Sequence, residues 1–121
     1  MKVVFKTEQN SFNVQFNDSL TAREILKKLP INSVVSTWGD EIYFDIGFKA
    51  SAERATMEVS VGDVAYWPQG KCLCIFFGPT PASTSQEPLP ASPVVIVGKT
   101  EVSPRELRDI QLGEKITVEA A

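Results

Sequence analysis

Residues 62–81 read GDVAYWPQGKCLCIFFGPTP. A tyrosine, a tryptophan and two phenylalanines stand here beside turns rich in glycine and proline, and no catalytic motif lies near them. The runs Val64–Trp67 and Lys71–Phe77 are typical of strands, and Pro68–Gly70 between them is typical of a turn. The segment is therefore either the densest part of a β core or the wall of an apolar binding groove.

Short β-rich runs also occur through the rest of the chain. Gly39–Asp40 and Gly62–Asp63 are turn signals between such runs. We expect Lys49–Thr56 to be a loop or a single helical turn, and Gly78–Pro93 to be a long surface loop. The other expected strands are Lys2–Lys6, Ser11–Phe16, Ser33–Trp38, Glu41–Phe48, Val94–Val97 and Lys115–Glu119.

Two short helices are expected among these strands. Apolar residues near helical spacing predict an amphipathic helix over Leu20–Lys28, which Pro30 stops. Ser103 as a cap and Pro104 at the first position predict a second helix. Because most of the strands separate the two helices, the order is not a repeating βαβ pattern. It favours a closed antiparallel barrel with a helix over each open end.

Length and composition bound the class of protein. The chain has 121 residues and a net charge of −3, so we expect one domain, 1–121, of mainly β structure. Its basic residues are scattered, which argues against nucleic acid as a partner. The longest apolar run, Leu73–Phe77, is too short to cross a membrane. Because Lys2–Phe5 is β-like rather than an apolar leader, we expect a cytoplasmic protein.

The two cysteines, Cys72 and Cys74, lie in one predicted strand. Alternate residues of a strand point to the same face, so these two do not readily bridge to each other. The chain has no histidine, and a metal site usually needs three or four ligands. We therefore expect buried free thiols, no metal site and no cofactor.

Several motifs resemble the cyclophilin fold and, more closely, a small prokaryotic family of cyclophilin-like proteins. The family's WGDE-Y-F segment has its counterpart at residues 38–44, and its GD-AYWP-G and C-FFGPTP segments at residues 62–81. Residues 92–99, SPVVIVGK, are similar to the cyclophilin "HVVFGKV" strand. The resemblance implies a cyclophilin-like closed antiparallel eight-stranded β-barrel capped by two short helices.

The resemblance also implies peptidyl-prolyl cis-trans isomerase activity, but this chain departs from the residues associated with it. Cyclophilins place an arginine beside a Phe-Met-x-Gln segment, with a histidine in the groove. Weakening the amide resonance, whose barrier is ~18–20 kcal/mol, needs a strong donor at the prolyl nitrogen. Here Tyr66-Trp67-Pro68-Gln69 stands in place of that segment, and Gln69 is a neutral donor. We expect no catalytic residue and no guanidinium over the aromatic rings; weak isomerase activity remains the alternative.

The aromatic residues and their polar neighbours form the candidate ligand site. Only one member of each adjacent pair can face a given side of a strand, so about half of the aromatic residues are expected to fill the barrel. Thr80 belongs either to a rigid turn or to the lip of a groove. The acids Asp40, Glu41 and Asp63 lie at predicted turns, which explains Asp40 and Asp63 without catalysis. The candidate ligand-binding residues are Tyr43, Phe44, Tyr66, Trp67, Gln69, Phe77 and Thr80.

We therefore expect a binding protein that holds a peptide or a small apolar molecule in an aromatic groove. A homo-oligomer is the remaining alternative, because exposed aromatic residues also suit a subunit interface.

Overall fold

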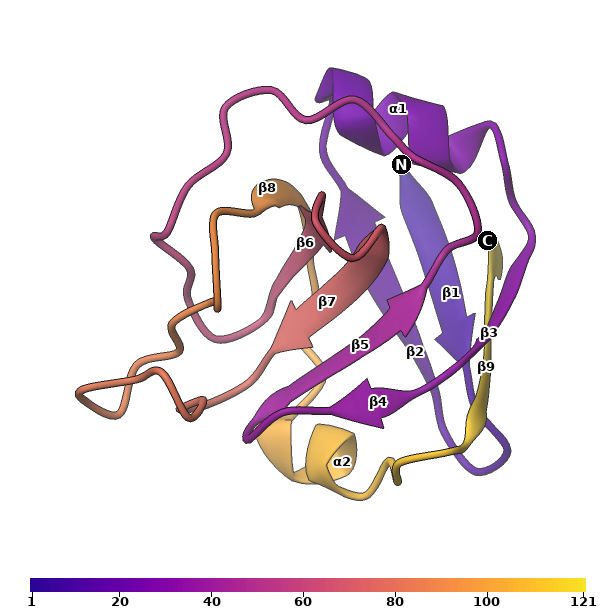
Figure 1. Ribbon diagram of the computed structural model, residues 1–121. Coiled ribbons are helices and arrows are strands. Elements are labelled where there is room, and N and C mark those ends of the chain that lie inside the picture. The colour runs from indigo at the N-terminus through magenta and orange to yellow at the C-terminus, as the bar shows by residue number, and fades with distance from the viewer.

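The computed structural model, which describes residues 1–121, is an antiparallel sheet of nine strands rolled into a nearly closed barrel (Figure 1). The order across the sheet is β3-β9-β1-β2-β8-β6-β7-β5-β4. The strands are β1 (Lys2–Lys6), β2 (Ser11–Phe16), β3 (Ile31–Val34), β4 (Ser36–Thr37), β5 (Glu41–Asp45), β6 (Asp63–Trp67), β7 (Cys72–Phe76), β8 (Val95–Lys99) and β9 (Lys115–Ala120).

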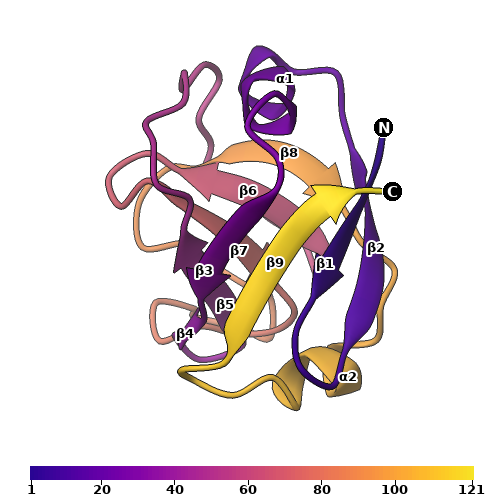
Figure 2. The ribbon, with the colours of Figure 1, turned by 90° about the vertical axis from the view of Figure 1, so that its right-hand side faces the viewer.

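The barrel closes because the two edge strands of the sheet are consecutive in the chain. β3 pairs with β9, β4 pairs with β5, and only Val35 separates β3 from β4. The backbone of Val35 bonds on both sides to the segment before β9, through Glu114 and Gly113. In the view of Figure 2, β3 lies beside β9 on the near wall of the barrel.

A short helix covers each end of the barrel. Helix α1 (Leu20–Leu26) begins at Ser19, whose hydroxyl accepts a hydrogen bond from the backbone N–H of Ala22. Helix α2 (Pro104–Arg108) begins in the same way at Ser103. Figure 1 shows α1 above the barrel and α2 below it.

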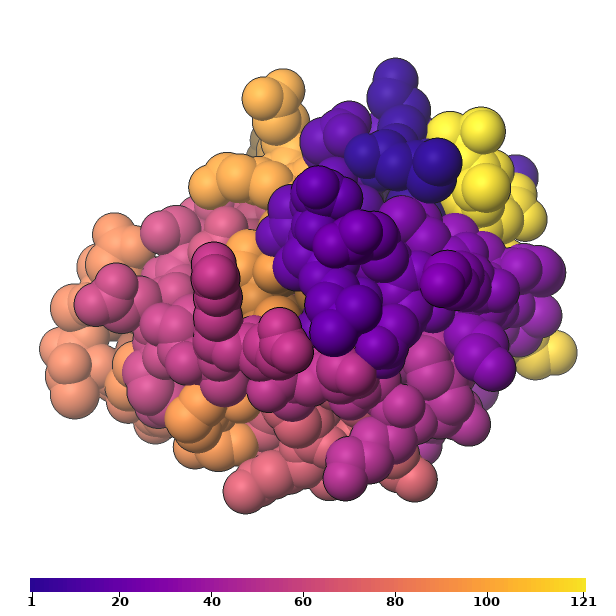
Figure 3. Space-filling view, turned by 90° about the horizontal axis from the view of Figure 1, so that it is seen from above, coloured from indigo at the N-terminus to yellow at the C-terminus, as the bar shows by residue number.

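The segment between β5 and β6 joins α1 over the upper end. The carboxylate of Glu24 accepts hydrogen bonds from the backbone N–H and the hydroxyl of Ser51, both at 2.7 Å. The hydroxyl of Thr21 donates to the carbonyl of Ser51. Seen from above in Figure 3, the violet atoms of α1 lie against the magenta atoms of this segment. The upper end of the barrel is therefore sealed by two parts of the chain.

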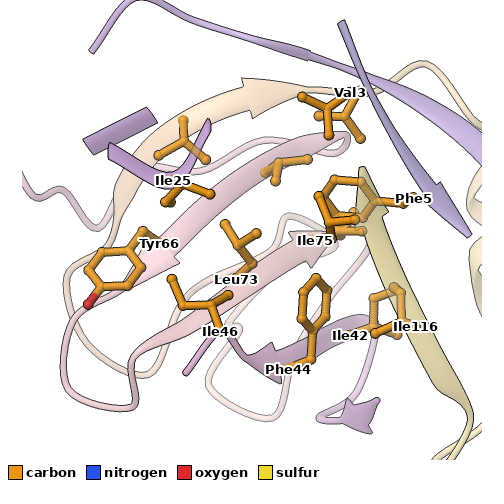
Figure 4. Close-up of a cluster of buried hydrophobic side chains, with 14 of the residues drawn as sticks. Val3, Phe5, Ile25, Ile42, Phe44, Ile46, Tyr66, Leu73, Ile75 and Ile116 are labelled. Carbon is orange, nitrogen blue, oxygen red and sulfur yellow. The ribbon is translucent and has the colours of Figure 1, made fainter. Parts of the chain in front are cut away.

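The barrel interior follows the alternation of the strands. In β5 the side chains of Ile42 and Phe44 point inward, and in β7 those of Leu73 and Ile75 do the same, all at most 1% exposed. Figure 4 shows these side chains converging with Phe5 in the centre of the barrel. Burial of this apolar cluster stabilises the fold at roughly 25 cal/mol per Å² of apolar surface.

The mainly β barrel with two short helices is confirmed, but the predicted eight strands are nine. The prediction of one strand over Ser33–Trp38 is wrong, because Val35 turns inward where the chain passes from β9 to β5 as partner. The predicted strand Glu41–Phe48 ends at Asp45, since Gly47 takes a positive φ of 84°. No helix is long and apolar enough to span a membrane.

Candidate functional site

A second, smaller apolar cluster lies on the outer face of the barrel. It is built from the alternate residues of β6 and β7 that do not enter the core, namely Ala65, Cys72, Cys74 and Phe76, together with Val94. Tyr43, Val59, Trp67 and Ile96 pack around it. An outward apolar surface on a small barrel has to be covered, and here the segments before β6 and before β8 cover part of it.

The part left open is a cavity of about 210 Å³. We call it the outer cavity. β5 and β6 supply one wall, the turn between β4 and β5 supplies Trp38, and the segment before β8 supplies the other wall. Its lining residues are Trp38, Glu41, Tyr43, Trp67, Pro90, Ala91 and Val94.

Trp67 is held in place by three neighbours. Its indole N–H donates to the hydroxyl of Ser92 at 2.6 Å, and this hydroxyl donates in turn to the side-chain carbonyl of Gln69 at 3.2 Å. Gly70 lies so close to the ring that an added Cβ would be 2.5 Å from Cε3 and Cζ3 of Trp67. The ring orientation is therefore fixed by both hydrogen bonding and shape.

Tyr43 and Trp67 form adjoining walls of the outer cavity. Their ring centroids are 6.3 Å apart and the ring planes meet at 80°, an edge-to-face arrangement. The two residues come from strands on either side of β7, where the small side chain of Cys74 lies opposite Tyr43 and that of Cys72 lies opposite Trp67. Small residues in this row leave space between the larger rings.

Glu41 is the acidic residue of the outer cavity. It is two residues before Tyr43 in β5, so strand alternation places both on the outer face. The residue is only 6% exposed, and burial raises the pKa of its carboxyl to about 7, although a hydrogen bond with the Cys74 thiol opposes that rise. No lysine or arginine lines the cavity.

The two thiols beside Glu41 are kept protonated. Burial, followed by the nearby carboxylates of Asp45 and Glu41, raises the pKa of the Cys72 thiol to about 11. Burial and then the Glu41 charge raise the pKa of the fully enclosed Cys74 thiol well above its ordinary value. Both cysteines are free and buried. A protonated thiol is a poor nucleophile, so these side chains serve the site as small apolar groups with a weak donor.

The predicted ligand-binding residues are divided by the structure into different places. Tyr43 and Trp67 line the outer cavity, and Gln69 lies behind Trp67 through Ser92. Phe44 and Tyr66 lie in the barrel core at 1% and 0% exposure, and the Tyr66 hydroxyl accepts a hydrogen bond from the backbone N–H of Ala50 at 3.0 Å. These two side chains, visible in Figure 4, face away from the cavity and are left out of the site.

Thr80 and Phe77 also lie outside the outer cavity. The Thr80 hydroxyl donates to the carbonyl of Leu89 at 2.6 Å, and its backbone N–H donates to Ser83 at 2.9 Å. These bonds hold the loop between β7 and β8 together, so Thr80 acts in the turn. Phe77 is 4% exposed and packs in the main core.

The expectation that no guanidinium faces the aromatic rings is wrong for Phe77. The guanidinium of Arg108, from α2, lies 5.9 Å from the centroid of the Phe77 ring and forms an ion pair with Asp40 at 3.1 Å. Sequence reasoning missed it because α2 and Phe77 come together only when the barrel closes. The groove around them is separate from the outer cavity and includes Ile42 and Leu107.

Several lining residues of the outer cavity were not predicted. The sequence pattern predicts a turn at Glu41, although its spacing of two from Tyr43 also indicates that both lie on one face of a strand. Trp38, Pro90, Ala91 and Val94 carried no signal in the sequence that would connect them with Trp67, because the path of the long loop before β8 decides their place. No three His, Cys, Asp or Glu side chains come together that could hold a metal ion.

Comparison with known proteins identifies the family to which this barrel belongs. A family described as Cyclophilin-like matches residues 1–119. The chain belongs to the Cyclophilin-like family. A solution structure of a hypothetical protein from Archaeoglobus fulgidus is 36% identical, with a TM-score of 0.85, over 100% of this chain and 95% of that one. No functionally curated protein matches.

These matches confirm the resemblance that the WGDE and FFGPTP motifs predicted, a small prokaryotic cyclophilin-like protein. The family description covers the whole barrel and gives no activity to its members. The function of this Cyclophilin-like protein has to be argued from the outer cavity itself.

Proposed function

We propose that this Cyclophilin-like protein is a binding protein that holds an apolar group of a peptide or small molecule in the outer cavity. The observation that best supports this proposal is the arrangement of Tyr43 and Trp67, whose rings form adjoining walls of the outer cavity. The other residues of the outer cluster pack against one another. Close packing is the rule in protein interiors, and an aromatic-lined concavity with few polar groups is typical of ligand sites.

The size of the outer cavity limits what it holds. At about 210 Å³ it is smaller than the roughly 300–1,000 Å³ of pockets that enclose a whole drug-sized ligand. It therefore suits one side chain of a peptide or one head group of a small molecule. The anchoring of Trp67 by Ser92 and Gly70 supports a preformed wall, which reduces the ordering cost of binding.

The two tryptophans of the chain, Trp38 and Trp67, both line the cavity and report on it directly. We expect a capped Ala-Ala-Pro-Phe peptide or a set of small aromatic fragments to shift their two indole N–H resonances in an NMR titration. Ala91→Phe, which fills the cavity, is expected to abolish these shifts. Ala82→Phe, in the same loop but outside the cavity, is the matched control. Shifts that survive Ala91→Phe unchanged would contradict the assignment.

Weak peptidyl-prolyl isomerase activity is the second candidate, and the position of Arg108 over Phe77 favours it. A guanidinium beside an aromatic ring is the kind of donor that isomerisation needs. A prolyl-peptide isomerisation assay tests it: acceleration that is lost in Arg108→Lys would place catalysis at the α2 groove. Acceleration that is lost in Gln69→Ala and Ala91→Phe instead would place it at the outer cavity.

A further inference from the structure

Glu41 presents a buried carboxyl group to a cavity that holds no positive charge. The residue is 6% exposed, its side-chain partner is the neutral Cys74 thiol, and no lysine or arginine lines the outer cavity. A carboxylate taken out of water without a cationic partner is costly, and proteins normally pair such a group or neutralise it. Here the chain supplies no partner, so a ligand is left to supply the positive charge.

The aromatic walls around Glu41 suit a cation as well. The face of an aromatic ring carries negative electrostatic potential, and cations bind over tryptophan and tyrosine faces. Tyr43 and Trp67 stand at 80° to each other, so they enclose a corner rather than a flat slot. Trp38 lines the same space from the turn before β5. Three aromatic side chains and one carboxyl therefore converge on one small volume.

We infer that the outer cavity binds an alkylated ammonium group, with Trp38, Tyr43 and Trp67 around its alkyl surface and Glu41 opposite its charge. This inference rests on the proposed function, whose ligand class it names. Such a group is apolar on its surface yet positively charged, and this combination matches the lining. A compact hydrated metal ion does not match it, because one carboxylate is a poor oxygen ligand set for such an ion. An anion would face the Glu41 carboxylate.

The Glu41 side chain contributes in two ways to this preference. When ionised, it attracts the ammonium group from a position that is itself only 6% exposed, where the attraction is stronger than between two fully hydrated charges. Without a cation, the neighbouring group that favours its ionised form is the Cys74 thiol, which lowers the pKa of Glu41 against the larger effect of burial. Burial and the Glu41 charge raise the pKa of the neighbouring thiols of Cys74 and Cys72, so neither thiol is ionised near pH 8.

The experiment compares choline with dimethylbutanol, its uncharged carbon isostere, at pH 8 by NMR titration of the Trp38 and Trp67 indole resonances. We expect choline to bind at least about tenfold more tightly than its isostere. Glu41→Gln keeps the shape and removes the charge, so it is expected to bring the two affinities together. Glu101→Gln, at an exposed position that does not line the cavity, is expected to leave the difference unchanged.

Equal binding of choline and its isostere to the unchanged protein would overturn the cation inference while leaving the proposed function standing. Absence of choline binding, with fragments or the prolyl peptide still shifting the indole resonances, would overturn it in the same way. If neither choline, the fragments nor the prolyl peptide shifted the indole resonances, both the cation inference and the proposed binding function would be overturned. Where choline binds more tightly than its isostere, a peptide carrying trimethyllysine, titrated in parallel, distinguishes a head group on a small molecule from one on a protein segment.

Discussion

The carboxyl group of Glu41 and the thiol of Cys74 are buried neighbours on the outer face of the barrel, on the adjacent strands β5 and β7. In the register of these strands Glu41 lies opposite Phe76 and Tyr43 lies opposite Cys74, so the pair is diagonal. Burial disfavours the ionised form of both groups, and the Glu41 charge raises the pKa of the Cys74 thiol further, whereas the Cys74 thiol favours the ionised form of Glu41 and partly offsets the rise in its pKa. The Glu41 carboxyl therefore stays largely protonated up to about pH 7, and the Cys74 thiol stays protonated at higher pH than that.

We expect Glu41 to make the protein less stable as the pH rises from about 4.5 to 7. The pKa of its carboxyl is raised from 4.5 to about 7, so the unfolded chain loses this proton first and unfolding becomes easier across that interval. The loss amounts to roughly 2–3 kcal/mol in the free energy of unfolding. Urea denaturation at a series of pH values measures it.

Glu41→Gln provides the reference for that measurement, because it keeps the shape of the side chain without a titrating group. Glu24, whose pKa is lowered by hydrogen bonds from Ser51, acts in the opposite direction and loses its contribution as the pH falls. Subtracting the curve of the variant from that of the unchanged protein removes this term. A difference that stays constant between pH 4.5 and 8 would show that Glu41 titrates normally.

The thiols of Cys72 and Cys74 are expected to react slowly in the folded protein. Both are buried, and burial raises the pKa of each, so little thiolate exists at pH 8. Alkylation by iodoacetamide should be at least about tenfold slower than in urea-unfolded protein. Mass spectrometry counts the modified thiols. Rapid alkylation of either cysteine under native conditions would mean that the outer cluster opens.

Substitution of the two tyrosines is expected to affect different properties, stability for Tyr66 and ligand binding for Tyr43. Tyr66→Phe leaves the buried backbone N–H of Ala50 without its acceptor, and we expect a loss of about 1–3 kcal/mol in unfolding free energy with unchanged ligand affinity. Tyr43→Ala removes a wall of the outer cavity and is expected to weaken ligand binding. Thermal unfolding and the NMR titration measure both. Weaker binding in Tyr66→Phe would return this residue to the site.

The alternation of side chains in β5 and β6 shows which parts of the fold and of the site can be predicted from the sequence. Period-two spacing groups Tyr43 with Glu41 and Asp45, and these carboxylates mark that face of β5 as the outer one. In β6 an aromatic residue lies on each face, so spacing alone does not say whether Tyr66 or Trp67 faces the core. The strands, turns and barrel were predictable from local patterns and motifs. The break at Val35 and the position of Arg108 over Phe77 depend on which strands become partners, and no local pattern carries that information.

Gly70 offers a test of whether the Trp67 wall has to be fixed for binding. Gly70→Ala would place a Cβ 2.5 Å from two ring carbons of Trp67, so the indole has to shift and its hydrogen bond to Ser92 is strained. We expect a changed Trp fluorescence spectrum and weaker ligand binding. Gly47→Ala is the matched control: Gly47 has a φ of +84° but no atom near an added Cβ, so this change is expected to cost about 1 kcal/mol of stability and leave the cavity intact. If Gly70→Ala bound ligand as well as Gly47→Ala, the orientation of Trp67 would be irrelevant to the site.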